Sequence, residues 1–106
     1  MDQRTNKNIK DYIRHLRKTF SNLEKVYLFG SFVKNSENTE SDIDVALILS
    51  DLNDTQRFEI QVELMKIAYK YDVRIEPHPI SSSNFNRSNP FSAEILNTGI
   101  ELFSAA

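Results

Sequence analysis

Two aspartates and a Gly-Ser pair form the most informative pattern in this chain of 106 residues. Gly30-Ser31 ends the apolar run 26–29, and after ten further residues Asp42-Ile43-Asp44 opens a second apolar run. On a strand, Asp42 and Asp44 project from the same face roughly 6.5 to 7 Å apart, because a strand rises about 3.3 Å per residue. Two such carboxylates repel each other unless a cation compensates them, and hard oxygen ligands suit Mg²⁺. The spacing therefore predicts a magnesium site at the start of the second strand.

The Gly30-Ser31 pair predicts a phosphate site beside that metal. Glycine lets a phosphate approach the main chain, and the amides of the following turn and the Ser31 hydroxyl can donate hydrogen bonds to its oxygens. Because Mg²⁺ usually keeps substrate phosphates among its ligands, the predicted substrate is a nucleoside triphosphate with its Mg²⁺. Each motif alone has a simpler reading, a plain turn or a solvated strand start. The functional interpretation rests on their combination.

A third carboxylate on an adjacent strand would complete a two-metal site and help an attacking hydroxyl lose its proton. Residues 72–76 alternate polar and apolar side chains, which is typical of a strand with one buried face. Asp72 is the first choice for this third carboxylate and Glu76 is the alternative. The polar residues of this stretch could equally form an exposed row of salt bridges. His78, which lies between two prolines, is interpreted as a surface-loop residue rather than a ligand.

Hydrophobic periodicity predicts the elements that hold these residues in place. An amphipathic helix is expected over 7–20, and a short strand over 25–29 stops at Gly30. The stretch 43–49 is apolar except for Asp44, which favours a central strand covered on both faces. A long helix is then expected from Asn53 or Asp54 to about Lys70. Its buried stripe would consist of Phe58, Val62, Met65 and Tyr69, widened by Ile60, Leu64, Ile67 and Ala68.

The last third of the sequence predicts a strand, a short helix and a further strand. Strand 72–76 is expected to end at Pro77, because proline cannot donate to a sheet. Asn89 and Pro90 start the last helix, which ends before a left-handed Gly99, and 100–103 can add an edge strand. The order of helices and strands indicates a compact α/β layer fold.

Length and composition indicate one domain, over residues 1–106, with a single core. The 13 Lys and Arg against 15 Asp and Glu give a net charge of −2, which supplies no cationic field for a long nucleic acid. Cysteine is absent, which excludes disulfides and thiolate metal sites. With no apolar run long enough to cross a bilayer and no apolar signal core at the amino terminus, a cytoplasmic protein and no membrane partner are expected.

Gly30-Ser31, ten residues and Asp42-Ile43-Asp44 resemble the signature of the nucleotidyltransferase superfamily that includes DNA polymerase β and the kanamycin nucleotidyltransferases. The length resembles that of the minimal nucleotidyltransferases (MNT), which consist of the catalytic core alone. The resemblance spans about residues 26–77 and implies an α/β (α+β) fold, a small mixed β-sheet packed against helices. It also implies that the aspartates bind Mg²⁺ in a two-ion site. The segment 71–74 resembles the strand of the third carboxylate, which supports Asp72 and leaves Glu76 open, while Asn35 stands where many relatives have glycine.

Relatives with this short motif include antitoxins paired with HEPN-domain ribonuclease toxins, some of which transfer AMP from ATP to a toxin tyrosine. The resemblance therefore implies Mg²⁺-dependent transfer of a nucleoside monophosphate, foremost AMP from ATP, to a hydroxyl of a protein partner such as a HEPN toxin. Asp42, Asp44 and Asp72 would be catalytic, with Gly30 and Ser31 on the phosphates. An oligomer is compatible with the sequence. The alternative is a non-catalytic module that binds a nucleotide or a partner and neutralises or scaffolds that partner.

Overall fold

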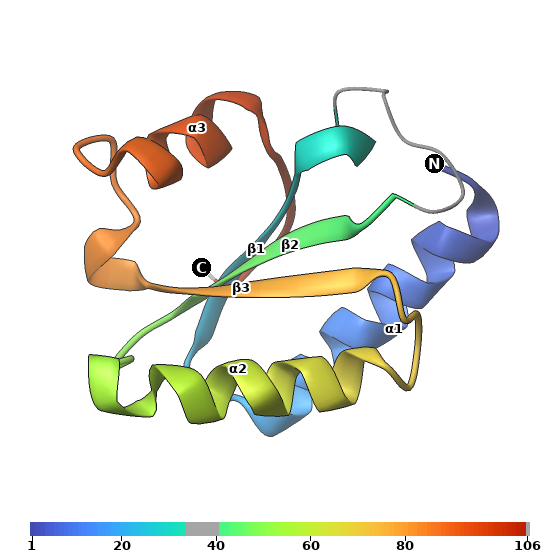
Figure 1. Ribbon diagram of the computed structural model, residues 1–106, viewed down its shortest axis with the longest axis horizontal. Helices are drawn as coiled ribbons and strands as arrows, with labels where there is room; N and C mark the ends of the chain where they lie inside the picture. Colours follow the sequence, from blue (N-terminus) through green and yellow to red (C-terminus); the bar gives the residue numbers. More distant parts are fainter. Residues whose placement is uncertain (34–40, 106) are drawn as a thin grey trace.

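The computed structural model describes residues 1–33 and 41–105, and within them the chain forms a four-stranded mixed sheet with helices on both faces (Figure 1). β1 is antiparallel to both β2 and β4, whereas β2 and β3 are parallel. This arrangement confirms the predicted α/β class, the small mixed sheet and the central position of β2. Asn35 lies outside the described residues. The strands, in the spatial order β3-β2-β1-β4, are β1 (Leu23–Phe29), β2 (Ile43–Leu49), β3 (Ile75–Ser81) and β4 (Ile100–Ser104).

Side-chain caps fix where the helices begin. The side chains of Asp2, Asn53 and Asn89 each accept a hydrogen bond from a main-chain N–H in the first turn of their helix. The first helix begins before the predicted residue 7, because Asp2 caps it. None of the described helices combines the length and the apolar character that a membrane-spanning helix needs. The helices are α1 (Gln3–Thr19), α2 (Asp54–Ala68) and α3 (Pro90–Thr98), with short 3₁₀ turns η1 (Gly30–Phe32) and η2 (Ser82–Asn84).

Two hydrophobic cores lie on opposite faces of the sheet. The larger core joins α1 and α2 to one face, through residues such as Leu16, Leu64 and Val45. The smaller core joins α3 to the other face, through Ile95 and Ile48. Because side chains alternate along a strand, the odd-numbered residues of β2 face the larger core and the even-numbered residues face the smaller one. The aspartate at position 44 therefore lies on the face covered by α3.

The buried side of α2 differs from the prediction. Phe58 and Tyr69 are 77% and 55% exposed, whereas Leu64, Ile67 and Ala68 are buried. These three residues belong to the part that widens the predicted stripe, and this part of the helix surface faces the sheet. The prediction of burial is therefore confirmed for Leu64, Ile67 and Ala68 and wrong for Phe58 and Tyr69, and the predicted cap at Asn53 is confirmed.

The third strand also differs from the prediction, because it runs from Ile75 through two prolines to Ser81 instead of ending at Pro77. β3 is an edge strand, so every second residue has its main-chain groups directed away from β2. Proline at such a position costs no hydrogen bond within the sheet. The carbonyls of Pro77 and Pro79 accept hydrogen bonds from side chains of α2, Gln61 Nε2 at 2.7 Å and Arg57 Nη1 at 2.9 Å. The outer edge of the sheet is thus closed by α2.

Gly99 ends α3 as predicted, but it is not left-handed. Its φ of −76° and ψ of 164° are those of extended backbone. A side chain is excluded for another reason, because a Cβ atom would lie 2.6 Å from the Ile95 carbonyl oxygen and 3.2 Å from that of Leu28. The chain then continues into β4, which pairs with β1 and confirms the predicted edge strand.

Candidate active site

The register of the sheet brings Asp44 and Glu76 side by side. In the parallel pair of β2 and β3, Asp44 lies opposite Glu76 and Ala46 lies opposite His78. In the antiparallel pair of β1 and β2, Asp44 lies opposite Phe29, the residue before Gly30. Side chains at paired positions share a face of the sheet. Asp44, Glu76 and the Gly30 turn therefore meet on the α3 face, at one end of three neighbouring strands.

Acidic side chains from β3 and from the start of β2 form the centre of this site. One ligand atom each from Asp44, Glu76 and His78 lies within 4.8 Å of the other two. The carboxyl group of Glu76 also shares a hydrogen bond with Asp42. The pKa of Glu76 is raised, first because the carboxyl group loses hydration and second because of this hydrogen bond. Such a cluster of like charges is the environment that a bound cation would stabilise.

The donor set fits a divalent cation that prefers oxygen. Asp42 and Glu76 are exposed and Asp44 is half-buried, so their oxygens are open to a metal that keeps water and phosphate oxygens among its ligands. The imidazole nitrogen of His78 is a softer donor than Mg²⁺ prefers. His78 Nε2 lies 3.1 Å from Asp44 Oδ1, and because an ionised carboxylate can only accept, the imidazole N–H donates this hydrogen bond. We therefore assign His78 to orienting Asp44, as partners of metal-binding carboxylates commonly do.

His78 is the site residue that the sequence interpretation missed. Its ring packs edge-on against the ring of Phe29, with the two ring centroids 5.1 Å apart. It also lies near the ring of Phe91 on α3, with a distance of 6.2 Å between the ring centroids. The surface-loop interpretation was wrong, because His78 lies on β3 and is half-buried. The signal that could have found it is the i, i+2 spacing from Glu76, which places both side chains on one face of a strand. The two flanking prolines concealed that strand.

Gly30 has a conformation and a neighbour that disfavour any side chain. Its φ is +81°, in the region that glycine adopts at little cost. A Cβ atom at this position would collide with Asp44 Oδ2. The turn η1 thus lies directly against the carboxylate, and the half-buried Ser31 follows in the same turn. The predicted phosphate-binding pair and the predicted metal-binding pair are neighbours in the structure.

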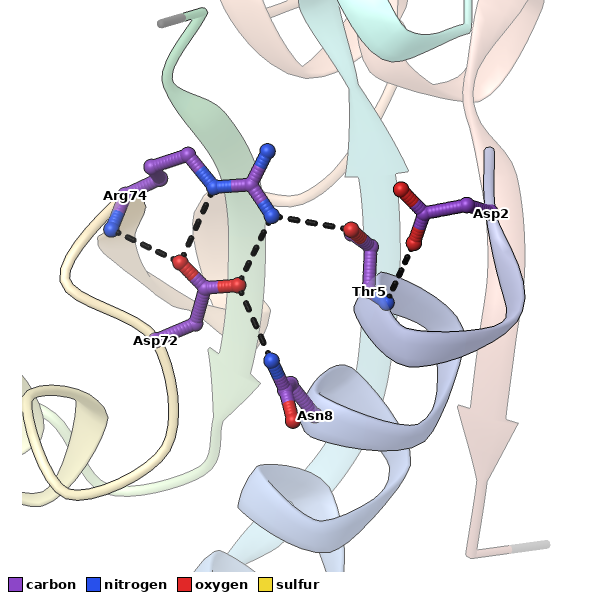
Figure 2. A network of polar contacts seen from close by, with 5 residues as sticks. All are labelled: Asp2, Thr5, Asn8, Asp72 and Arg74. Atoms are coloured by element: carbon purple, nitrogen blue, oxygen red, sulfur yellow. Dashed lines mark hydrogen bonds and ion pairs between the residues drawn. The ribbon is translucent and has the colours of Figure 1, made fainter. Parts of the chain in front are cut away.

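Asp72, the first choice for the third carboxylate, is engaged elsewhere. It lies in the turn before β3, where Oδ1 accepts hydrogen bonds from Nε (3.0 Å) and the main-chain N–H (3.1 Å) of Arg74 (Figure 2). Oδ2 accepts from Arg74 Nη2 at 2.9 Å and from the Asn8 amide at 3.2 Å. The bonds from Arg74 lower the pKa of Asp72 to about 2. Among the described residues, Asp72 is not part of the cluster formed by Asp44, Glu76 and His78.

A cavity of about 330 Å³ opens beside His78, at the outer edge of β3. It lies across β2 from the Gly30 turn, because the strand order places β3 on one side of β2 and β1 on the other. Phe91 is 47% exposed and supplies an apolar wall. The lining residues are Arg57, Gln61, His78, Pro79, Ile80, Asn84, Asn89, Phe91 and Ser92.

The sequence model of the polymerase beta nucleotidyltransferase family matches residues 7–106. The chain belongs to this family. The match covers nearly the whole chain and includes every residue of the site described above. The chain is accordingly a nucleotidyltransferase, the class of enzyme that the family comprises. A comparison with curated protein sequences finds no match.

Solved structures similar to this nucleotidyltransferase show the same fold. A Sulfolobus solfataricus protein described as a nucleotidyltransferase aligns with a TM-score of 0.65 and 17% identity, over 93% of this chain and 79% of the other. A toxin-antitoxin structure with AMP-PNP aligns at 0.61 and 22%, over 93% and 73%. The complex of a tri-AMPylated Shewanella oneidensis HEPN toxin with its MNT antitoxin aligns at 0.59 and 22%, over 92% and 71%. MNT antitoxins of HEPN/MNT pairs are therefore among its structural neighbours.

Proposed function

We propose that this nucleotidyltransferase transfers AMP from ATP to a hydroxyl group of a protein partner, as the MNT antitoxin of a HEPN toxin. The observation that carries the proposal is the meeting of Asp44, Glu76 and the Gly30 turn at one end of three strands. An acidic metal site directly against a glycine turn fits a substrate that carries both a metal ion and a chain of phosphates. A Mg²⁺-nucleoside triphosphate is such a substrate.

The position of each carboxylate determines its proposed role. Asp42 and Asp44 would hold Mg²⁺, with Glu76 as the third carboxylate in place of Asp72. Glu76 is favoured because it lies opposite Asp44 in the parallel register, while Asp72 is paired with Arg74. Bound Mg²⁺ would neutralise charge on the phosphate oxygens and lower the pKa of a hydroxyl bound to it.

The proposed reaction is an in-line displacement at the α-phosphorus. The acceptor oxygen forms a bond to this phosphorus, and the bond from phosphorus to the oxygen that bridges to the β-phosphate breaks. Pyrophosphate leaves on the side of Gly30 and Ser31, and the proton of the acceptor hydroxyl passes to Glu76. In-line geometry places the acceptor opposite the leaving group. That side is the β3 side, where the cavity beside His78 gives room for an acceptor side chain.

A protein acceptor is supported by the neighbours and by the shape of the site. Two of the three similar structures described above contain a toxin and its antitoxin, and in one of them the toxin is AMPylated. The cavity is open, and the partner would provide the rest of the acceptor site. A free small-molecule acceptor would need a more enclosed pocket, since such ligands are usually buried over most of their surface.

The test is to purify the chain in complex with its native partner and to record intact masses with and without Mg²⁺-ATP. We expect the partner to gain the mass of one or more AMP units only when both Mg²⁺ and ATP are present. Asp44→Asn should lower the rate by about 100-fold or more, because it removes a carboxylate at the metal site. Asp51→Asn is the matched control, since it makes the same change at an exposed position where asparagine tolerates the φ of 56°. An unmodified partner under these conditions would instead favour the non-catalytic binding module.

A further inference from the structure

We propose that Arg74, held in place by Asp72, positions the two halves of the transfer site relative to each other. One half is the turn η1 with Gly30 and Ser31, and the other is the start of β2 with its aspartates. The inference rests on the proposed function, because it concerns the same site. It gives Asp72 a role as a positioning residue, distinct from the metal-binding role that the sequence suggested.

The two halves of the site lie in direct contact, and their relative position matters. The α-carbon of Gly30 lies so close to Asp44 that a Cβ atom would collide with the carboxylate. A shift of η1 against β2 would therefore displace Asp44 or open a gap between the carboxylate and the turn. Reactions between bound groups are sensitive to such shifts, and a misplacement of about 1 Å can lower a rate by about 100-fold. The site thus needs a contact that fixes η1 against β2.

Arg74 makes contacts with both halves. Its guanidinium carbon lies 5.8 Å from the centroid of the Phe32 ring, and Phe32 is the last residue of η1. Its main-chain carbonyl accepts a hydrogen bond of 2.8 Å from the N–H of Ile43, the first residue of β2. Phe32 and Ile43 are both buried, at 7% and 0% exposure, so each anchors its segment in the larger core. Arg74 therefore contacts both η1 and the start of β2.

A polar network prevents Arg74 from swinging away (Figure 2). Asp72 binds its guanidinium through both carboxylate oxygens, and the Asp72 side chain is only 8% exposed. The Nη2 group also donates a 2.8 Å hydrogen bond to the hydroxyl of Thr5, which is 3% exposed. The Asn8 amide donates to Oδ2 of Asp72, the oxygen that Arg74 Nη2 also binds. The network fixes Arg74 to the first turns of α1, whose start is in turn capped by Asp2.

The geometry of this network depends on the planar guanidinium group. Arg74 uses one edge of the plane for Asp72, while the plane itself lies near the ring of Phe32. A lysine ammonium is a point charge and cannot satisfy both carboxylate oxygens and an aromatic face at once. Arg74→Lys therefore keeps the charge and removes the positioning contact, which makes it the informative variant.

The experiment compares Arg74→Lys and Asp72→Asn with wild type in the complex with the native partner, at a temperature where circular dichroism shows each complex to be folded. Two quantities are measured, the kcat and KM of AMP transfer, and the native-state amide exchange of Val33 and Ile43, whose N–H groups bind Gly30 and Arg74 carbonyls. We expect kcat to fall about tenfold or more, with the KM for ATP changed by less than about threefold, because the ligand groups remain while their alignment loosens. Exchange at both amides should accelerate about tenfold.

Asp11→Asn is the matched control, because Asp11 accepts hydrogen bonds from Lys7 (2.7 Å) and Arg14 (3.0 Å) on the exposed side of α1. It should leave kcat and both exchange rates within about twofold of wild type. If a main variant fails to fold, Thr5→Val, which removes only one acceptor of Arg74, replaces it. Unchanged kcat in a wild-type-like active complex, or unchanged exchange at Val33 and Ile43, would overturn the positioning role and leave the proposed function standing. A wild-type complex without transfer would overturn the proposed function, and the exchange rates would then decide the positioning role alone.

Discussion

At the scale of single residues, the partner of a carboxylate decides what that carboxylate can do. Asp72 and Glu76 are four positions apart in the sequence. Hydrogen bonds from Arg74 lower the pKa of Asp72, whereas loss of hydration and the hydrogen bond with Asp42 raise the pKa of Glu76. The first environment stabilises a fixed negative charge, and the second leaves a carboxyl group able to exchange a proton or bind a cation. The sequence alone could not distinguish them, because Asp42, the partner of Glu76, lies on a distant segment, and because Arg74 binds Asp72 only through the shape of the turn before β3.

His78 provides a prediction at this scale. His78→Phe keeps an aromatic ring against Phe29 and Phe91 but removes the N–H that binds Asp44. We expect this variant to lower the rate of transfer and the affinity for Mn²⁺ about tenfold to 100-fold, as loss of an orienting partner commonly does. His78→Gln, which restores an N–H donor, should recover part of both. Rates from intact-mass time courses and Mn²⁺ titrations by electron paramagnetic resonance measure the effect, and equal values for the two variants would contradict the orienting role.

At the scale of elements, local signals were sufficient for most boundaries. The helix caps at Asn53 and Asn89 and the end of β1 at Gly30 could be predicted from the sequence, because each of these residues acts within one turn of its own position. The continuation of β3 through two prolines was not, because it depends on the strand lying at the edge of the sheet. The buried side of α2 was predicted only in part, since the apolar residues cover a wide surface of the helix and tertiary packing selects which of them are buried. Missing the continuation of β3 removed His78 from the predicted site.

The closure of the β3 edge by α2 gives a prediction for this scale. Gln61→Met keeps the length of the side chain but removes the donor to the buried carbonyl of Pro77. We expect the free energy of unfolding to fall by about 1 to 2 kcal/mol, because a buried acceptor loses its hydrogen bond. Gln56→Met, the same change at an exposed position of the same helix, should alter it by less than about 0.5 kcal/mol. Urea unfolding measures both values, and equal values for the two variants would contradict the closure.

At the scale of the whole molecule, the sheet order assembles the site from three separate segments. The turn after β1, the start of β2 and the start of β3 meet only because β2 lies between the other two strands. The motif spacing anticipated that Gly30 and Asp44 would be neighbours, since the two strands are consecutive in the sequence. The parallel pairing of β2 with β3 follows a crossover through α2, and its register decides that Glu76 faces Asp44. A shift of one residue in that register would place Glu76 on the opposite face.

The stability of the whole fold should depend on the protonation of Asp72. Its pKa is about 2 in the folded chain and 3.8 as an ordinary aspartate, so its ion pair stabilises the fold fully above the higher value. This contribution, about 2 kcal/mol, is lost as the pH falls through the window between these two values. Urea unfolding at pH 6 should therefore show wild type to be more stable than Asp72→Asn, and the difference should shrink below pH 3. A difference that does not vary with pH would contradict the role of this ion pair.

The central claim is that Glu76, beside Asp42 and Asp44, completes a nucleotidyl-transfer site. Its most direct test is the rate of AMP transfer to the native partner, followed by intact mass under single-turnover conditions, for Glu76→Gln and Asp72→Asn. We expect Glu76→Gln to lower the rate by about 100-fold or more and Asp72→Asn by about tenfold, because only Glu76 would contact the reacting groups. A Glu76→Gln variant with the wild-type rate, together with no transfer by a folded Asp72→Asn variant, would contradict the account.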